Sequence, residues 1–340
     1  MYKNIFAHDE WKRSEHMAVR ENVGWYLWTH QLMEVTGEDA QRYLDYVCPN
    51  DIASLAIGRC RYTTMLNEQG EIIDDVVVMR KDEDVFWIST LYATMEDDWF
   101  YYHDGGFDFD YEEITEDWHM FAVQGPNSLK VLNGIVEGGV DDLKFFAFKD
   151  AQINGIDVTI NRAGFTGEKF GYEVYCAADD ADAVEESIAG AVEAAGGKEI
   201  TEFQVFAWTL PTEAGFYYMR DLAHTNPFEV GLEHGINWDK DFIGKDALLK
   251  VKEEGPAREM IGFEVCDENE DFYIRSKQYG GPGEPVFVDD EEVGRVSKLV
   301  YSYVRDVNNG YILANKGAFE KGDRVNIHGF DCVITDRKWL

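Results

Sequence analysis

The sequence has 340 residues, of which 45% are hydrophobic and 14% aromatic, enough for two ordinary domains with several cores. Acidic residues outnumber basic ones by 66 to 31, and the resulting formal charge of −35 argues against nucleic-acid and membrane partners, because such a surface repels phosphate groups. Five scattered cysteines, no metal-ligand spacing among the histidines and a start without an apolar leader predict a reduced cytoplasmic protein without a metal.

Along the chain, a pattern of strand, glycine turn and helix occurs twice, at 34–47 (EVTGEDAQRYLDYV) and at 122–135 (AVQGPNSLKVLNGI). Glycine permits the tight turn, and a polar residue after it satisfies the free amides at the helix start. We therefore predict two related α+β halves, at about 30–117 and 118–200. The alternative is that such turns are common in any α+β protein.

Further helices are predicted within 180–197 and at 244–254, where apolar residues recur at helical spacing. Beyond residue 258 the chain consists of short β runs separated by turns rich in Gly, Asp and Asn, which is typical of a small barrel or sandwich. The predicted organisation is an α+β body over 1–257, in which 1–29 and 201–257 complete the two halves, and a C-terminal β-barrel over 258–340.

An adjacent pair of carboxylates, Asp74 and Asp75, interrupts the apolar strand in the segment 61–80 (RYTTMLNEQGEIIDDVVVMR). Successive strand residues point to opposite faces, so only one member of the pair can face a cavity. A carboxylate there could orient an amine or stabilise a developing cation. The structural alternative is an Asp that caps a turn on an edge strand.

A glycine-rich loop precedes Glu173 in the segment 161–176 (NRAGFTGEKFGYEVYC). Such a loop can bring backbone close to a flat ligand, and an ionised carboxylate accepts two parallel N–H bonds, as an amino-pyrimidine edge requires. The alternative is an ordinary hairpin with an exposed Glu. The segments 15–31 (EHMAVRENVGWYLWTHQ) and 224–248 (HTNPFEVGLEHGINWDKDFIGKDAL) are distinctive only in combination with these two.

Together and in this order, these segments resemble the glycine-cleavage T-protein (aminomethyltransferase) family of folate-dependent enzymes. YTTMLNEQGEIIDDVVV resembles its Y-x-x-M-L-N-x-x-G-G-x-x-D-D-L-x-V motif, AGFTGEKFGYE its G-Y-T-G-E-x-G-Y-E motif, and FAVQGPNS its S-x-Q-G-P turn. The resemblance implies two interleaved α+β (ferredoxin-like) domains around a central hole that holds tetrahydrofolate, followed by a β-barrel.

The resemblance also implies roles for individual residues. Asp74, the first of the pair, matches the family's catalytic Asp, and Glu173 matches the Glu that binds the pterin. The positions that line the pterin and aminobenzoyl pocket match Tyr62, Met65, Val76 and Phe165.

Other positions depart from the family. Its folate-contacting Arg is replaced by Ala207 and an Asn by Leu91, and the aromatic segment 90–103 (TLYATMEDDWFYYH) suggests an altered donor site. We expect a rebuilt donor pocket, with candidate residues Tyr26, His30, Tyr92 and His234.

The main functional hypothesis is a stand-alone tetrahydrofolate-dependent methyltransferase or demethylase that takes a methyl group from a small O-, S- or N-methylated compound. The first alternative is a glycine-cleavage-type aminomethyltransferase with a lipoyl carrier protein as partner, although a charge of −35 would repel an acidic carrier. The second is a non-catalytic folate-binding assembly or maintenance factor. Against it, the cysteine motif of that branch has no counterpart between Arg162 and Glu173.

Overall fold

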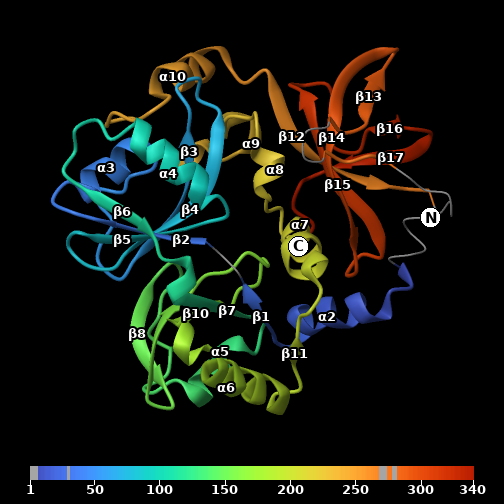
Figure 1. The fold of residues 1–340 in the computed structure, drawn as a ribbon. Coiled ribbons are helices and arrows are strands. Elements are labelled where there is room, and N and C mark those ends of the chain that lie inside the picture. Colours follow the sequence, from blue (N-terminus) through green and yellow to red (C-terminus); the bar gives the residue numbers. More distant parts are fainter. Residues whose placement is uncertain (1–6, 29–30, 268–273, 278–281) are drawn as a thin grey trace.

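The computed structural model describes residues 7–28, 31–267, 274–277 and 282–340. Three sheets form three lobes around the short helices α7 (Leu210–Glu213) and α8 (Met219–Leu222) (Figure 1). Two lobes combine sheets with helices, and the third is almost entirely strands, so the predicted α+β class is confirmed. No helix within the described ranges is long and apolar enough to cross a membrane.

The sheet of the first half has the strand order β3-β4-β5-β2-β6. Its members are β2 (Gln31–Thr36), β3 (Cys60–Leu66), β4 (Ile72–Arg80), β5 (Val85–Thr90) and β6 (Asp110–Glu113). Helices α3 (Ala40–Val47) and α4 (Ala93–Tyr102) pack on it, and the buried side chains of Tyr43 and Phe100 meet edge to face between them. This core covers one face of the sheet and leaves the other to face the centre of the molecule.

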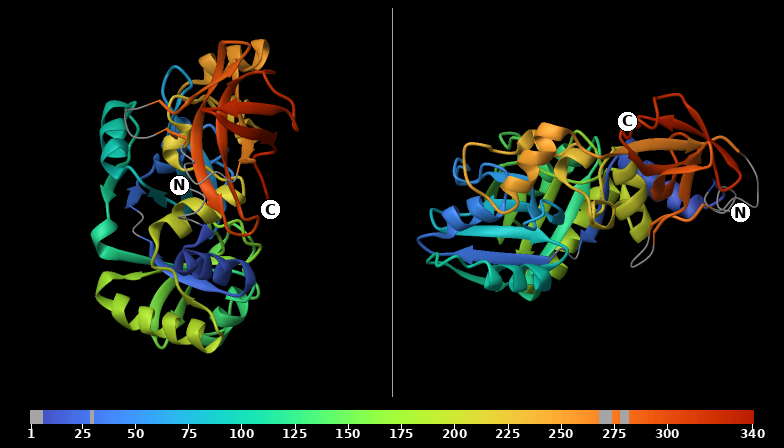
Figure 2. Two further views of the ribbon diagram at one scale, coloured as in Figure 1. Left: turned by 90° about the vertical axis from the view of Figure 1, so that its right-hand side faces the viewer. Right: turned by 90° about the horizontal axis from the view of Figure 1, so that it is seen from above.

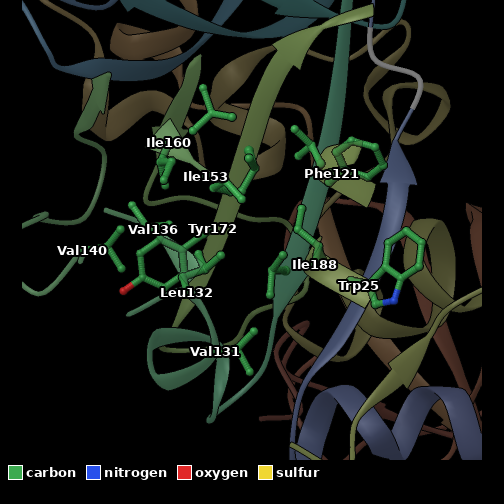
Figure 3. Packing of buried hydrophobic residues seen from close by; sticks show 14 of the residues in the cluster. Trp25, Phe121, Val131, Leu132, Val136, Val140, Ile153, Ile160, Tyr172 and Ile188 are labelled. Atoms are coloured by element: carbon green, nitrogen blue, oxygen red, sulfur yellow. The ribbon is translucent and has the colours of Figure 1, made fainter. Parts of the chain in front are cut away.

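The sheet of the second half has the order β11-β1-β7-β10-β9-β8. Its strands are β1 (Gly24–Trp28), β7 (Trp118–Gln124), β8 (Phe148–Ile153), β9 (Ile156–Asn161), β10 (Gly171–Ala177) and β11 (Lys198–Glu199), with helices α5 (Ser128–Ile135) and α6 (Ala181–Ala194). Trp25, Phe121 and Ile188 belong to the core between sheet and helices (Figure 3). Strand β1 therefore crosses from the N-terminal segment into the second half, which interleaves the two halves.

Both strand–glycine–helix patterns form the same turn. Gly37 follows β2 and Gly125 follows β7, each with φ near +123°, a conformation that side chains with a Cβ rarely adopt. A Cβ at Gly37 would lie 2.8 Å from the carbonyl oxygen of Asp108, and one at Gly125 would lie 2.6 Å from that of Asn22. Glycine is therefore required at both turns for conformation and for space.

The C-terminal sheet has the order β13-β14-β15-β12-β17-β16. Its strands are β12 (Arg258–Val265), β13 (Pro285–Val288), β14 (Glu291–Ser302), β15 (Val307–Asn315), β16 (Arg324–Ile327) and β17 (Phe330–Thr335). The edge strands β13 and β16 contact each other, so the sheet nearly closes into a barrel around an apolar core. The expected barrel is confirmed, while the domain boundary at 257/258 stays a prediction.

Helix α2 (Glu10–Glu21) lies beside the barrel in both Figures 1 and 2. Inside this contact, His16 Nε2 and Glu213 Oε2 are 2.8 Å apart, and both side chains are fully buried. Arg20 Nη2 donates to the same carboxylate oxygen at 3.0 Å, and the Ser302 hydroxyl donates to Oε1 at 2.5 Å. One carboxylate thus joins α2, α7 and the barrel strand β14.

The segment between the halves and the barrel carries short helices α9 (Pro227–Val230) and α10 (Lys245–Glu254). A buried ion pair attaches α8 to the barrel: Lys298 Nζ lies 2.6 Å from Asp221 Oδ2, and neither side chain is exposed. The backbone N–H of Tyr218 donates to Asp221 Oδ2 and the Ser297 hydroxyl to Oδ1. The pair fixes the position of α8 at the centre of the molecule.

We expect Lys298→Met to lower the free energy of unfolding by about 3 to 5 kcal/mol, because it leaves the Asp221 charge buried without its cation. Urea denaturation followed by tryptophan fluorescence measures the change. The control is Lys316→Met, which removes a half-exposed partner of Glu259 and should cost less than about 1 kcal/mol. Equal losses in the two variants would contradict the importance of the buried pair.

Candidate functional site

A cavity, here called the central cavity, lies where the two half-sheets meet the segment 206–219. Its wall is largely aromatic, with the side chains of Tyr26, Trp28, Tyr62, Phe165, Phe206, Tyr217 and Tyr218. Two carboxylates, Asp75 and Glu173, also line it, whereas no Lys or Arg does so within the described parts of the chain. The cavity therefore presents negative groups inside an apolar shell.

Glu173 enters the central cavity from β10 and is only 3% exposed. Asn161 Nδ2 donates to its Oε2 at 2.9 Å, and the Tyr175 hydroxyl donates to the same oxygen at 3.3 Å. Burial raises the pKa of Glu173 to about 7, although these two hydrogen bonds act in the opposite direction. Both bonds use Oε2, so Oε1 has acceptor capacity left for N–H groups of a ligand.

The side chains of the two neighbouring aspartates lie on opposite faces of strand β4. Asp75 lines the central cavity, and its Oδ2 accepts a hydrogen bond of 2.9 Å from the Tyr62 hydroxyl. Asp74 is fully buried on the opposite face, where it accepts hydrogen bonds from the Thr90 hydroxyl and the Asp75 amide and lies beside Glu96 of α4. The alternation of the strand thus places Asp75, and not Asp74, on the wall of the central cavity, and the catalytic role expected for Asp74 stays a prediction.

The carboxyls on β4 and α4 hold protons more tightly than usual. Burial, reinforced by the negative charge of Asp74, raises the pKa of Asp75 to about 7 despite the Tyr62 hydrogen bond. Burial also raises the pKa of Asp74, and burial together with Asp74 raises the pKa of Glu96. Asp75 is consequently expected to change protonation near neutral pH.

Of the residues expected from the sequence to bind cofactor or substrate, five line the central cavity: Tyr26, Tyr62, Val76, Phe165 and Glu173. Met65 does not, because its side chain is fully buried in the core between the first sheet and its helices.

Two of the remaining candidates, Tyr92 and His234, are not on the described wall of the central cavity. Tyr92 lines a neighbouring cavity, and His234 is 87% exposed beside Glu233, so the expected pocket role of His234 is corrected. His30 lies outside the described residues.

Sequence reasoning missed the wall formed by the segment after residue 204. Phe206 belongs to a π-helical turn, Val205–Thr209, and stacks on Tyr26 with ring centroids 4.4 Å apart. Tyr217 donates from its hydroxyl to the Val230 carbonyl oxygen at 2.8 Å, under the guanidinium of Arg337. The free volume of the central cavity is about 60 Å³. The only sequence signal for this wall is the unusual density of aromatics in 203–218.

Comparison with known proteins shows to which family the chain belongs. Residues 2–240 match the family model described as the GCVT N-terminal domain. The chain belongs to the glycine-cleavage T-protein family. It is 32% identical over 328 residues to an aminomethyltransferase of Geobacillus sp. (strain WCH70), covering 93% of this chain and 85% of that protein. An aminomethyltransferase of Clostridium botulinum (strain 657 / Type Ba4) is 35% identical over 262 residues, 75% of this chain and 70% of that protein.

The fold of this T-protein family member agrees with a solved structure. The crystal structure of glycine cleavage system aminomethyltransferase T from Bartonella henselae superposes with a TM-score of 0.84, covering 97% of this chain and 89% of that one at 23% identity. The family uses tetrahydrofolate, and membership makes this chain a folate-dependent transferase. The aromatic shell and the buried carboxylate of Glu173 suit the flat, donor-rich pterin ring.

The raised pKa of Asp75 predicts a pH dependence of stability. Between the ordinary aspartate pKa of 3.8 and about 7, the native carboxyl retains a proton that the unfolded chain has released, so stability falls as pH rises. We expect Asp75→Asn to remove this contribution, so that the variant gains stability relative to wild type from pH about 5 to about 8.

Urea denaturation across this pH range measures the effect, with the exposed Asp98→Asn on α4 as the control. A constant difference between Asp75→Asn and wild type at every pH would contradict the assignment.

Proposed function

We propose that this chain transfers a one-carbon group from a small methylated donor to tetrahydrofolate bound in the central cavity. The observation that carries the proposal is that Glu173 and Asp75, from different halves, face one aromatic cavity. Tetrahydrofolate supplies the amine nitrogen that accepts the one-carbon group. The residues of the chain bind and orient the two reactants and hold the charge that develops between them.

Glu173 is suited to bind the amino-pyrimidine edge of the pterin. Two parallel N–H donors would compensate the burial that now raises its pKa to about 7, and would favour the ionised carboxylate. Because the free volume of the central cavity is only about 60 Å³ and the Tyr26–Phe206 stack forms part of its wall, we expect these rings to separate when the pterin binds. The π-helical turn that carries Phe206 is a natural place for such an adjustment, since such turns frequently occur at functional sites.

Asp75 is suited to act at the reacting atoms. Its carboxylate, held by the Tyr62 hydroxyl in a cavity with few polar neighbours, can accept a proton from the attacking amine or stabilise positive charge on the donor. Electrostatic stabilisation is stronger there than in water, because the surroundings have a low effective dielectric constant. This role transfers to Asp75 the function that the family resemblance implied for Asp74.

Two classes of one-carbon donor are supported by different observations. Ala207 and Leu91 line the central cavity, so the departures from the family pattern lie where ligands bind, which supports a donor different from that of the relatives. The second candidate, aminomethyl transfer from a lipoyl carrier protein, is supported by the relatives named aminomethyltransferase, one of which matches over 93% of the chain.

We expect Glu173→Gln to weaken tetrahydrofolate binding by tenfold or more, since a charge-assisted hydrogen-bond acceptor contributes about 1.5 to 3 kcal/mol. Anaerobic isothermal titration calorimetry measures the dissociation constant. Glu199→Gln, an exposed change on β11, is the matched control. An unchanged constant for Glu173→Gln would exclude it from the pterin site.

Turnover is tested by incubating the protein anaerobically with tetrahydrofolate and candidate donors and identifying the folate product by mass spectrometry. Methyltetrahydrofolate from a small donor supports the proposal, whereas methylenetetrahydrofolate formed only with an aminomethyl-lipoyl protein supports the second candidate. Asp75→Asn should reduce turnover by about 100-fold or more and spare folate binding. Asp74→Asn should retain most activity, and the reverse ranking would return the catalytic role to Asp74. Folate binding without any product would indicate a binding factor.

A further inference from the structure

A second cavity, of about 580 Å³, lies between the first-half sheet, α8 and the barrel. Met219 lines both this cavity and the central cavity, so the two spaces adjoin at α8. We call it the cationic cavity, because its wall includes five basic side chains: Arg220, His224, Arg258, Lys277 and Arg295.

The charge of the cationic cavity is opposite to that of the whole molecule. The chain has 66 acidic and 31 basic residues, yet no Asp or Glu appears on the wall of this cavity within the described residues. Clustering like charges costs free energy unless something compensates it. In an acidic protein, such a cluster around a hollow indicates a site for an anion.

The basic groups are held in place but retain donor capacity. Arg258 forms an ion pair with Glu229, and Lys277 Nζ donates to the Ala223 carbonyl oxygen at 2.8 Å. Burial lowers the pKa of Lys277, and the charge of Arg258 adds to this effect although Asp221 opposes it. A bound anion would stabilise the charged form of the Lys277 ammonium group and so oppose the lowering of its pKa.

Arg220 lies over the rings of Trp208 and Tyr218, and its buried Nε has no hydrogen-bond partner within the described residues. Arg295 is bound to Glu292 and to the Gly283 carbonyl oxygen and is about 40% exposed. Each guanidinium has five N–H donors, so both can bind a further carboxylate.

The rest of the wall is apolar, with Ile73, Tyr92, Met95, Val296 and Leu313. A ligand with a short apolar stem and a carboxylate end fits this combination. The central cavity itself has no Lys or Arg on its described wall, and Ala207 stands where the family has an Arg. An anionic group on a ligand of the central cavity must therefore be neutralised outside it.

We propose that the cationic cavity binds the carboxylate end of a ligand whose reacting end passes Met219 into the central cavity. The carboxylate has two possible sources, the one-carbon donor or the glutamyl group of tetrahydrofolate. The inference rests on the proposed function only for the reacting end, because anion binding by the cavity can be measured alone.

A third cavity offers a matched comparison. It has a volume of about 510 Å³, touches the central cavity at Tyr62, and carries Arg59 and Arg61. It has two basic groups against five, so we place the anion in the cationic cavity. Arg61→Gln removes one positive charge beside the central cavity without changing the cationic one, and serves as the control.

The first measurement is calorimetric titration of glutarate into the folate-free protein, with uncharged glutaramide for comparison. Glutarate should bind and glutaramide should not, and Lys277→Met/Arg295→Leu should weaken glutarate binding by about tenfold or more, because charge-assisted hydrogen bonds to the carboxylate are lost. Arg220→Leu is a second, independent variant, and circular dichroism confirms that each is folded. Arg61→Gln should bind glutarate as wild type does.

The second measurement identifies the source of the carboxylate. If the glutamyl group is the ligand, tetrahydrofolate competes with glutarate and binds the double variant about tenfold more weakly, while tetrahydropteroate, which lacks glutamate, is unaffected. If the donor supplies it, glutarate and tetrahydrofolate bind together. Both results support the site.

The proposal is overturned if glutarate fails to bind, if glutaramide binds equally, or if Arg61→Gln alone abolishes glutarate binding. Failure of tetrahydrofolate to bind at all, with glutarate binding intact, would instead remove the proposed function and leave the anion site standing.

Discussion

The burial of carboxyl groups at the centre of a very acidic protein is the constraint on which the structure depends. Removing a carboxylate from water is costly, so each one needs a cation, hydrogen-bond donors or a proton. Glu213 is compensated by His16 and Arg20, and Asp221 by Lys298. Glu173 and Asp75 have only hydrogen bonds, and their raised pKa values record the difference.

This difference distinguishes the carboxylates that join the lobes from those that face the central cavity. The compensated groups join α2, α7 and α8 to the barrel and so hold the three lobes together. Two of the incompletely compensated groups, Glu173 and Asp75, face the central cavity, where a ligand can supply the missing donors or charge. Asp74 and Glu96, whose pKa values burial also raises, do not line it. Perturbed carboxyls that lie in a cavity are characteristic of functional sites. The cationic cavity has the opposite character, because its basic side chains lie next to a central cavity whose described wall has no Lys or Arg.

Many residues of the central cavity could be predicted from motifs in the sequence. Tyr62, Val76, Phe165 and Glu173 come from separated motifs and meet in one cavity. Met65 was misplaced because β3 points it toward the helices, and His234 because its turn lies at the surface. The aromatic wall around Phe206 and the basic lining of the second cavity depend on contacts between distant segments, which leave no local pattern.

The sequence by itself determined the local elements. Gly37 and Gly125 allow turns that other residues resist, and the short β runs beyond 258 require a sheet. Alternation along β4 also required that Asp74 and Asp75 face opposite ways. Only the tertiary structure decided which of them faces the cavity, because the phase of a strand is set by the helix that covers its other face. Likewise, only packing brought β1 into the second half and gathered five basic residues around one cavity.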